Sequence, residues 1–327
     1  VLYTMGGSVF MLISLLVLFD ITPGHAFAME TMSEGARVLP PQAQVMIFLG
    51  FLVGFGVKMP IFPIHGWLPL AHVEAPSPIS ILLSGILLKM GSYGLIRAAS
   101  MLPDAVVALQ PLLAGLAFFS LIYGGLLAWR QTDLKAMIAY SSVSHMGIVL
   151  LGIAALNIAG LTGALMQMVA HGLVAGSLFL LIGLLYERTH TRDVNDYSSL
   201  VQVTPRFAFF TSLALLAGMA IPGTAGFIAE LHAIVGGFEA WGWTILLISI
   251  GMMVTAAYSV RTIGRLFTGP VHNRMRDVQD LGPLELTAAG VLASAIILLG
   301  IAPWPALQLM ASSVSQLGAV FAAVQGG

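Results

Sequence analysis

The chain of 327 residues contains no cysteine, and only 8% of its residues are charged. Without cysteine it can form no disulfide, thiolate metal site or cysteine nucleophile. Its formal net charge of −1 and its lack of basic tracts argue against nucleic acid as a partner. The GxSxG elbow, the Walker loop, the dinucleotide fingerprint and the HExxH motif are also missing. We therefore expect no cofactor and no metal in this chain.

Apolar residues make up 58% of the chain, and its mean hydropathy is +0.96. Soluble domains carry roughly 25% charged residues, so this composition indicates an all-α integral membrane protein. A spanning helix needs about 20 apolar residues. We interpret the first such stretch as a spanning helix and not as a signal peptide, because it has neither a basic leader nor a small-residue cleavage site. The sequence predicts about nine spanning segments, at 2–20, 43–68, 77–98, 105–128, 134–156, 160–186, 205–236, 240–267 and 284–309.

Two of these segments are too long for one straight helix across a core of about 30 Å. Each contains helix breakers, Pro60 and Pro63 in segment 43–68, and Pro222 with Gly223 in segment 205–236. Irregular backbone at membrane depth is tolerated only where it is buried in protein or faces water. Both segments are therefore predicted to be broken helices.

The two breaks are five segments apart, and each has an ionisable residue nearby, Lys58 and Glu230. This is the pattern that an internal repeat leaves, and an odd spacing makes the second copy inverted. We expect one membrane domain over 1–327. Residues 1–98 would be the remainder of the first inverted repeat, 105–267 the second, and 284–309 a C-terminal transmembrane helix.

The cations divide unequally between the two sides of the predicted membrane. One side has only Arg37 and Arg97. The positive-inside rule places the richer side in the cytoplasm, and stretch 21–42 and the C-terminus opposite. The richer side has Arg130, Lys135, Arg188, Arg192, Arg206, Arg261, Arg265, Arg274 and Arg276.

Five candidate ion carriers fall near the middle of a predicted span or at a helix break, which is unusual for a bilayer. A charge at the bilayer centre costs about 2.5 to 3.5 kcal/mol on insertion scales, so such residues commonly line a polar cavity or carry ions. Burial disfavours the charged forms of lysine and glutamate alike, and histidine titrates near neutrality without help. The predicted proton-relay residues are Lys58, Lys89, His145, His171 and Glu230.

Structural explanations for the same residues remain open. A lysine can snorkel or pair with a carboxylate, and buried histidines or a protonated Glu230 can hydrogen-bond between helices. His65, His72 and Glu74 follow the first break, where they would line an inlet or cap a helix. Lys135 has Asp133 beside it, which favours a surface pair. Haem ligation by two histidines on different helices is a weaker alternative.

Several long runs of the sequence resemble the antiporter-like proton-channel subunits of respiratory complex I, most of all the M type, which is called chain 4 in mitochondria and the D type in photosynthetic complexes. The similarity extends over nearly the whole chain. The runs that carry it are VKMPIFPIHGWLPLAHVEAPSPISILLSGILLKMGSYGLIR, TDLKAMIAYSSVSHMGIVLLGI, MVAHGL, LYERTHTRD and IPGTAGFIAEL.

The resemblance implies a fold of fourteen helices with two inverted five-helix repeats, of which this sequence contains the part from the sixth helix onward. Lys58 matches the broken-helix lysine of the first half-channel, and Lys89 matches the lysine on the next helix. His145 and His171 match the central polar axis, and Glu230 matches the terminal carboxylate of the M type. The glutamate that pairs with the first lysine in the family would lie before residue 1.

The resemblance also implies a function as a proton-translocating membrane subunit of an NADH:quinone oxidoreductase, without redox chemistry of its own. Flavin, iron–sulfur clusters and quinone would belong to partner subunits, in a bacterial inner membrane. Further partners would be the paralogous antiporter-like chains, the quinone-site subunits and the lipid bilayer. Mrp-type sodium/proton antiporters and membrane-bound hydrogenases contain similar domains, and a truncated scaffold that does not pump is a third alternative.

Overall fold

The computed structural model describes residues 1–22, 24–272 and 275–325, so Arg274 lies outside the described residues. These ranges form helices and no strand, apart from one isolated bridge between Asp133 and Asp193. The first repeat region contains α1 (Leu2–Ile21), α2 (Met29–Arg37), α3 (Pro41–Lys58), α4 (Trp67–Glu74), α5 (Ser77–Leu82), the π-helix η1 (Leu83–Leu87) and α6 (Leu88–Met101). The rest contains α7 (Pro103–Ala108), α8 (Gln110–Arg130), α9 (Leu134–Ala154), α10 (Ile158–Thr189), η2 (Val194–Asp196), α11 (Leu200–Val203), α12 (Pro205–Gly218), α13 (Ala225–Trp241), η3 (Gly242–Leu247), α14 (Ile248–Phe267), α15 (Pro283–Ile301) and α16 (Trp304–Gln325).

Nine helical runs in the described ranges are long and apolar enough to cross a membrane. The predicted all-α integral membrane fold is therefore confirmed. The division into repeats over 1–98 and 105–267 stays a prediction.

Both predicted helix breaks are present. The helix α3 ends at Lys58, and the chain turns through residues 59–66 before α4 begins. The second break separates α12 from α13 over residues 219–224. Gly223 lies in this second break with a φ of 92°, a left-handed conformation that glycine adopts without steric cost. Prolines at both breaks remove backbone donors and cannot continue a helix.

The single C-terminal helix predicted at 284–309 is wrong. The structure has α15 and α16, separated at Ala302, whose φ of −126° and ψ of 66° are not helical. Pro303 follows directly, and the residue before a proline is sterically disfavoured in the α conformation. The sequence contained this signal, but the continuous apolar composition concealed the break.

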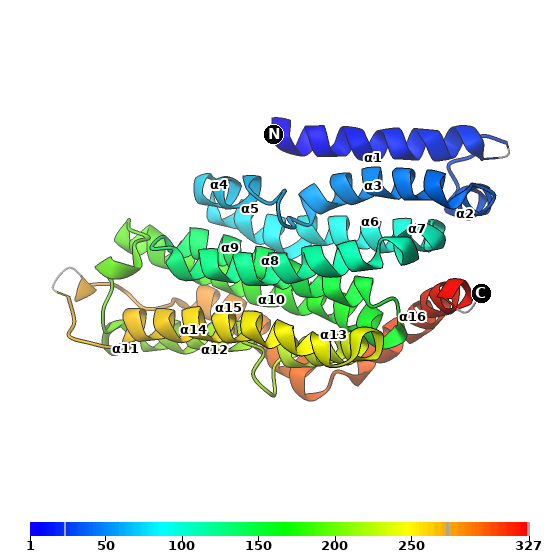
Figure 1. Cartoon of the computed structure of the whole chain (residues 1–327). Coiled ribbons are helices and arrows are strands. Elements are labelled where there is room, and N and C mark those ends of the chain that lie inside the picture. The colour runs from blue at the N-terminus through cyan, green and yellow to red at the C-terminus, as the bar shows by residue number, and fades with distance from the viewer. Residues whose placement is uncertain (23, 273–274, 326–327) are drawn as a thin grey trace.

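The helix α9 forms the centre of the bundle. In its apolar window 94% of residues are buried, against 17% in α1. Figure 1 shows α8, α9 and α10 in the middle, with α1 and α3 along one side and α12 to α14 along the other. An environment of protein on all sides explains why polar residues in α9 and α10 are tolerated at membrane depth.

The two ends of the bundle differ in their elements. Figure 1 shows α2, α7 and α16 at one end and α11 at the other. We call the end with α11 the basic end, since Arg192 and Arg265 lie there, near Asp133 and Asn195 respectively. The placement of this end in the cytoplasm stays a prediction from the positive-inside rule.

Candidate functional site

Lys89 and His171 meet in the interior. Lys89 Nζ lies 2.6 Å from His171 Nδ1, which joins α6 to α10. The ammonium also donates to the carbonyl oxygen of Ser84, which belongs to the π-helix η1. A charged lysine can only donate, so His171 Nδ1 accepts and its proton is on Nε2. Nε2 is buried and has no hydrogen-bond partner among the described residues, so it is free to pass on a proton.

His145 lies beside His171. Their ring centroids are 5.5 Å apart, with 56° between the ring planes. His145 Nε2 is 3.0 Å from the carbonyl oxygen of Gly218. This carbonyl has lost its helical partner because α12 ends there. Since a carbonyl only accepts, Nε2 carries the proton and the buried Nδ1 is left as a free acceptor.

Glu230 completes the cluster from the second broken helix. Its side chain on α13 is 5% exposed and has no hydrogen-bond or ion-pair partner in the described part of the chain. A cavity of about 10 Å³, which we call the relay cavity, is lined by Glu230, His145, His171, Gly218 and Gln167, among others. This volume is on the order of one water molecule. A single water there would have several polar neighbours.

The four residues are close enough for their charges to interact strongly. Two unit charges separated by the 5.5 Å between the histidine rings would repel by about 3 kcal/mol at an effective dielectric near 20. Moving one charge against 100 mV takes about 2.3 kcal/mol. The repulsion between two charges at this separation is therefore of the same size as the work needed to move a charge against such a potential.

Lys58 lies apart from this cluster. It is half-buried at the end of α3, and its Cβ lies 3.0 Å from the position that a Cβ at Gly91 of α6 would take. Within the described ranges no hydrogen bond joins the side chain of Lys58 to Lys89 or to any other residue. Four of the five predicted relay residues thus come together, and Lys58 does not. The relay role of all five stays a prediction.

The other sequence candidates have structural contacts. His72 is fully buried with its ring stacked on Phe179 at 4.4 Å. Lys135 donates to the carbonyl oxygen of Ala75 at 2.9 Å. The surface pair expected between Lys135 and Asp133 is wrong, because Asp133 caps α9 and forms an ion pair with Arg192 at 3.2 Å.

Gln167 and the π-helix were missed from the sequence. Gln167 lies one turn before His171 on α10, is 2% exposed, and has an unpartnered Oε1. A search for polar residues at i−4 from each candidate would have found it. Ser84 gave no such signal, since a π-helix cannot be read from apolar periodicity.

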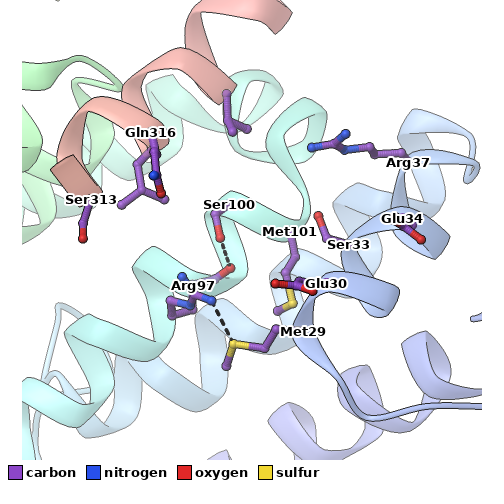
Figure 2. A pocket seen from close by; sticks show the side chains of 12 residues that line it. Met29, Glu30, Ser33, Glu34, Arg37, Arg97, Ser100, Met101, Ser313 and Gln316 are labelled. Atoms are coloured by element: carbon purple, nitrogen blue, oxygen red, sulfur yellow. Dashed lines mark hydrogen bonds between the residues drawn. The ribbon is translucent and has the colours of Figure 1, made fainter.

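A larger pocket of about 390 Å³ lies at the opposite end from the basic end, between α2, α6 and α16. Figure 2 shows Arg97 in it, with Nη2 donating to Met29 Sδ at 3.1 Å. Glu30, Glu34 and Arg37 also line this pocket. None of the four clustered relay residues does, so the pocket is separate from the candidate site.

The family model described as NADH:quinone oxidoreductase/Mrp antiporter, TM matches residues 1–255. The chain belongs to this family. One relative is named NAD(P)H-quinone oxidoreductase chain 4 2 and comes from Thermosynechococcus vestitus. It is 43% identical over 319 residues, which are 94% of this chain and 59% of the relative. Chain 4-1 of Synechocystis sp. is 37% identical, over 97% of this chain and 62% of the relative. The chain thus spans about 60% of the length of these curated relatives.

Two solved structures share this fold. A chain of respiratory complex I from Thermus thermophilus with bound NADH matches with a TM-score of 0.91 and 32% identity, over 100% of this chain and 68% of that one. The Mrp complex from Dietzia sp. matches with a TM-score of 0.84 over 99% of this chain and 68% of that one. At 18% identity, the Mrp likeness concerns the fold alone.

Proposed function

We propose that the chain conducts protons as the chain 4 (M-type) membrane subunit of an NAD(P)H:quinone oxidoreductase. The contact between Lys89 Nζ and His171 Nδ1 is the observation that carries this proposal, because it joins two groups that can each hold and release a proton. Relatives named as chain 4 favour this parent complex over an Mrp antiporter, which is matched at lower identity.

The proposed transfer runs from α6 to the second break. Lys89 gives a proton to His171 Nδ1 and becomes a neutral amine, and His171 releases its Nε2 proton towards His145 or the water of the relay cavity. Glu230 then accepts it as a carboxylate and becomes neutral. Every step moves one proton along existing or water-mediated hydrogen bonds, so no net charge is created inside the cluster. Lys58 would act upstream, where it receives protons from the basic end and shifts the charge state of Lys89.

The proposal assigns redox chemistry to other polypeptides. Flavin, iron–sulfur clusters and quinone would be held by partner subunits, since this sequence has no cysteine to ligate an iron–sulfur cluster and no dinucleotide fingerprint. The paralogous antiporter-like chains and the quinone-site subunits would flank this one in a bacterial inner membrane. Displaced charge from quinone reduction would reach the row of relay residues through the neighbouring membrane subunits.

Replacement of Lys89 by methionine in the native membrane complex tests the proposal. The uncharged side chain fills a similar volume but can neither hold a proton nor donate to His171. We expect the number of protons translocated per electron to fall while electron transfer and assembly continue. The ratio would be measured in inverted membrane vesicles with a pH-sensitive dye.

Tyr93→Phe provides the matched control, because Tyr93 is one turn along on the same helix and 54% exposed. It should leave the ratio unchanged. A normal ratio in Lys89→Met would contradict the proposed relay. If protons are translocated at the normal ratio only when sodium ions are present, the result would favour the sodium/proton antiporter class instead.

A further inference from the structure

Two more cavities continue from the relay cavity to the basic end. The first, here the tyrosine cavity, is lined by His145, His171, Gly218, Ser141, Tyr258 and Met137, among others. The second, here the surface cavity, is lined by Met137, Tyr258, Thr262, Asp133, Arg261 and Arg265, among others. Each has a volume of about 10 Å³, again on the order of one water.

The three cavities form a series because neighbouring cavities share their walls. His145, His171 and Gly218 line both the relay cavity and the tyrosine cavity. Met137 and Tyr258 line both the tyrosine cavity and the surface cavity. A proton moving from the surface cavity to the histidines must therefore pass these two side chains, and only the tyrosine carries a group that can relay it.

Hydroxyl groups are arranged around Tyr258. Tyr258 is 4% exposed on α14, and its hydroxyl lies near the hydroxyls of Thr255 and Ser141. Ser141 donates its own hydrogen to the carbonyl oxygen of Ile138 at 2.8 Å, so its oxygen remains an acceptor for Tyr258. Ser141 is also one turn before His145 on α9. Tyr258, Ser141 and His145 thus line the same tyrosine cavity, and the Nδ1 of His145 has no hydrogen-bond partner among the described residues.

Charged side chains with fixed protein partners line the surface cavity. Arg261 donates to the carbonyl oxygen of Trp129 at 2.6 Å, and Arg265 donates to Asn195 Oδ1. Asp133 is held by the amide nitrogens at the start of α9 and by Arg192. Because each charged side chain is bonded to protein, none of them needs to extend into the surface cavity.

We propose that Tyr258 is the gate of a second proton inlet, which leads from the basic end to the His145 and His171 pair without passing Lys58. A protonated water in the surface cavity gives its extra proton to the phenol oxygen and becomes neutral, while the phenol O–H gives its own proton to a water in the tyrosine cavity, which passes it on to His145. The phenol is neutral before and after, and one proton has moved. His145 Nδ1 is the acceptor at the end of this path.

This inference rests on the proposed function and adds a separate source of protons to the same histidine pair. Its consequence is kinetic. Closing one inlet should slow the reprotonation of His145 and His171. This should limit the complex when it turns over quickly and should matter little when turnover is slow. A structural defect would lower coupling at both speeds.

Tyr258→Phe, which removes only the hydroxyl, tests the gate in the native membrane complex. We expect the protons translocated per electron to fall at full turnover and to recover when the electron donor is made limiting. Thr262→Val, at the mouth of the same series, should show the same rate-dependent loss. Tyr140→Phe is the matched control on α9, since Tyr140 meets His65 edge to face and lines none of the three cavities, and it should have no effect.

The outcomes separate the inlet from the proposed function. A normal ratio in Tyr258→Phe at full turnover, together with a low ratio in Lys89→Met, would overturn the inlet and leave the relay standing. A loss in Tyr258→Phe that persists at slow turnover would also overturn it, because the effect would be structural. Normal ratios in both Tyr258→Phe and Lys89→Met would contradict the proposed function itself.

Discussion

His171 accepts a hydrogen bond from Lys89 at 2.6 Å through one ring nitrogen and turns its other nitrogen, buried and unpartnered, away from the lysine. One imidazole therefore contacts a cation on α6 and has a free proton site on its other side. An arrangement that served packing alone would be expected to satisfy both nitrogens, because an unsatisfied buried polar atom costs about 1 to 3 kcal/mol.

Replacement of His171 by glutamine should block the proposed proton transfer from Lys89 through His171. Glutamine keeps a similar size and a hydrogen-bonding group but cannot take up a proton at physiological pH. We expect the rate of proton transfer through the pair to fall by about 100-fold or more, the lower end of what a positioned acid–base group contributes. The protons translocated per electron in membrane vesicles would report this loss.

His232→Gln is the control for that substitution, because His232 bonds to the carbonyl oxygen of Ile228 and lines a different cavity. The double variant Lys89→Met with His171→Gln should be no worse than either single variant, since the two residues form one link. If the loss of proton translocation in the double variant equals the sum of the losses in the two single variants, the two residues act independently.

Glu230→Gln should separate transport from stability. The carboxyl group is buried without a hydrogen-bond or ion-pair partner among the described residues, so the neutral amide removes a potential charge that costs about 2.5 to 3.5 kcal/mol in a membrane. We expect the assembled complex to be as thermally stable as wild type or more so, while proton translocation is lost. Thermal unfolding of the detergent-solubilised complex and the vesicle assay would be measured together.

Glu239→Gln is the control for Glu230→Gln. Glu239 also lies on α13 but lines a separate cavity of about 690 Å³, so this variant should leave proton translocation intact. Equal loss in both variants would mean that negative charge on α13 matters in general and that the position of Glu230 is not special.

The helix breaks could be predicted because their signals are local. Prolines and an ionisable residue close together in an apolar run need no knowledge of neighbouring helices. The break between α15 and α16 had the same signal at Pro303, but no charge accompanied it. The all-helical membrane fold followed from composition for a similar reason, since only helices and closed barrels satisfy the backbone in lipid.

The geometry of the relay could not be predicted because it depends on contacts between distant segments. Lys89 and His171 are 82 residues apart in sequence, and the π-helix η1 that places the Ser84 carbonyl near Lys89 leaves no mark in the hydrophobic pattern. The separate position of Lys58 was also hidden, since an expected pair of lysines in adjacent segments says nothing about the direction of either side chain. Tyr258 was not noticed, because a lone tyrosine in an apolar helix is usually a packing residue.

Gly163→Ala should destabilise the packing of α10 against α13. A Cβ at Gly163 would lie 2.3 Å from the backbone nitrogen of Ala233, and backbone cannot move aside as a flexible side chain can. Overpacking of this kind costs about 1 to 3 kcal/mol or more. We expect a lower melting temperature and less assembled complex. At Gly115 on α8, where nothing lies within 4 Å of the added Cβ, the same exchange should be neutral or stabilise by about 0.5 to 1 kcal/mol. Equal effects at the two glycines would contradict the close approach.

Asn157 links the start of α10 to α13 through two separate hydrogen bonds. Its Oδ1 accepts from the amide nitrogen of Gly160 at 2.8 Å, and its Nδ2 donates to the carbonyl oxygen of Gly236 at 2.7 Å. Asn157→Ser retains the helix cap and loses the second bond, whereas Asn157→Ala loses both. An N-cap bond is typically worth about 1 kcal/mol, and a net internal hydrogen bond about 0.5 to 1.5 kcal/mol. Thermal unfolding should therefore rank the variants with serine between asparagine and alanine. A serine variant as stable as wild type would show that the bond to α13 adds nothing, and that α10 is held against α13 by close packing at glycines alone.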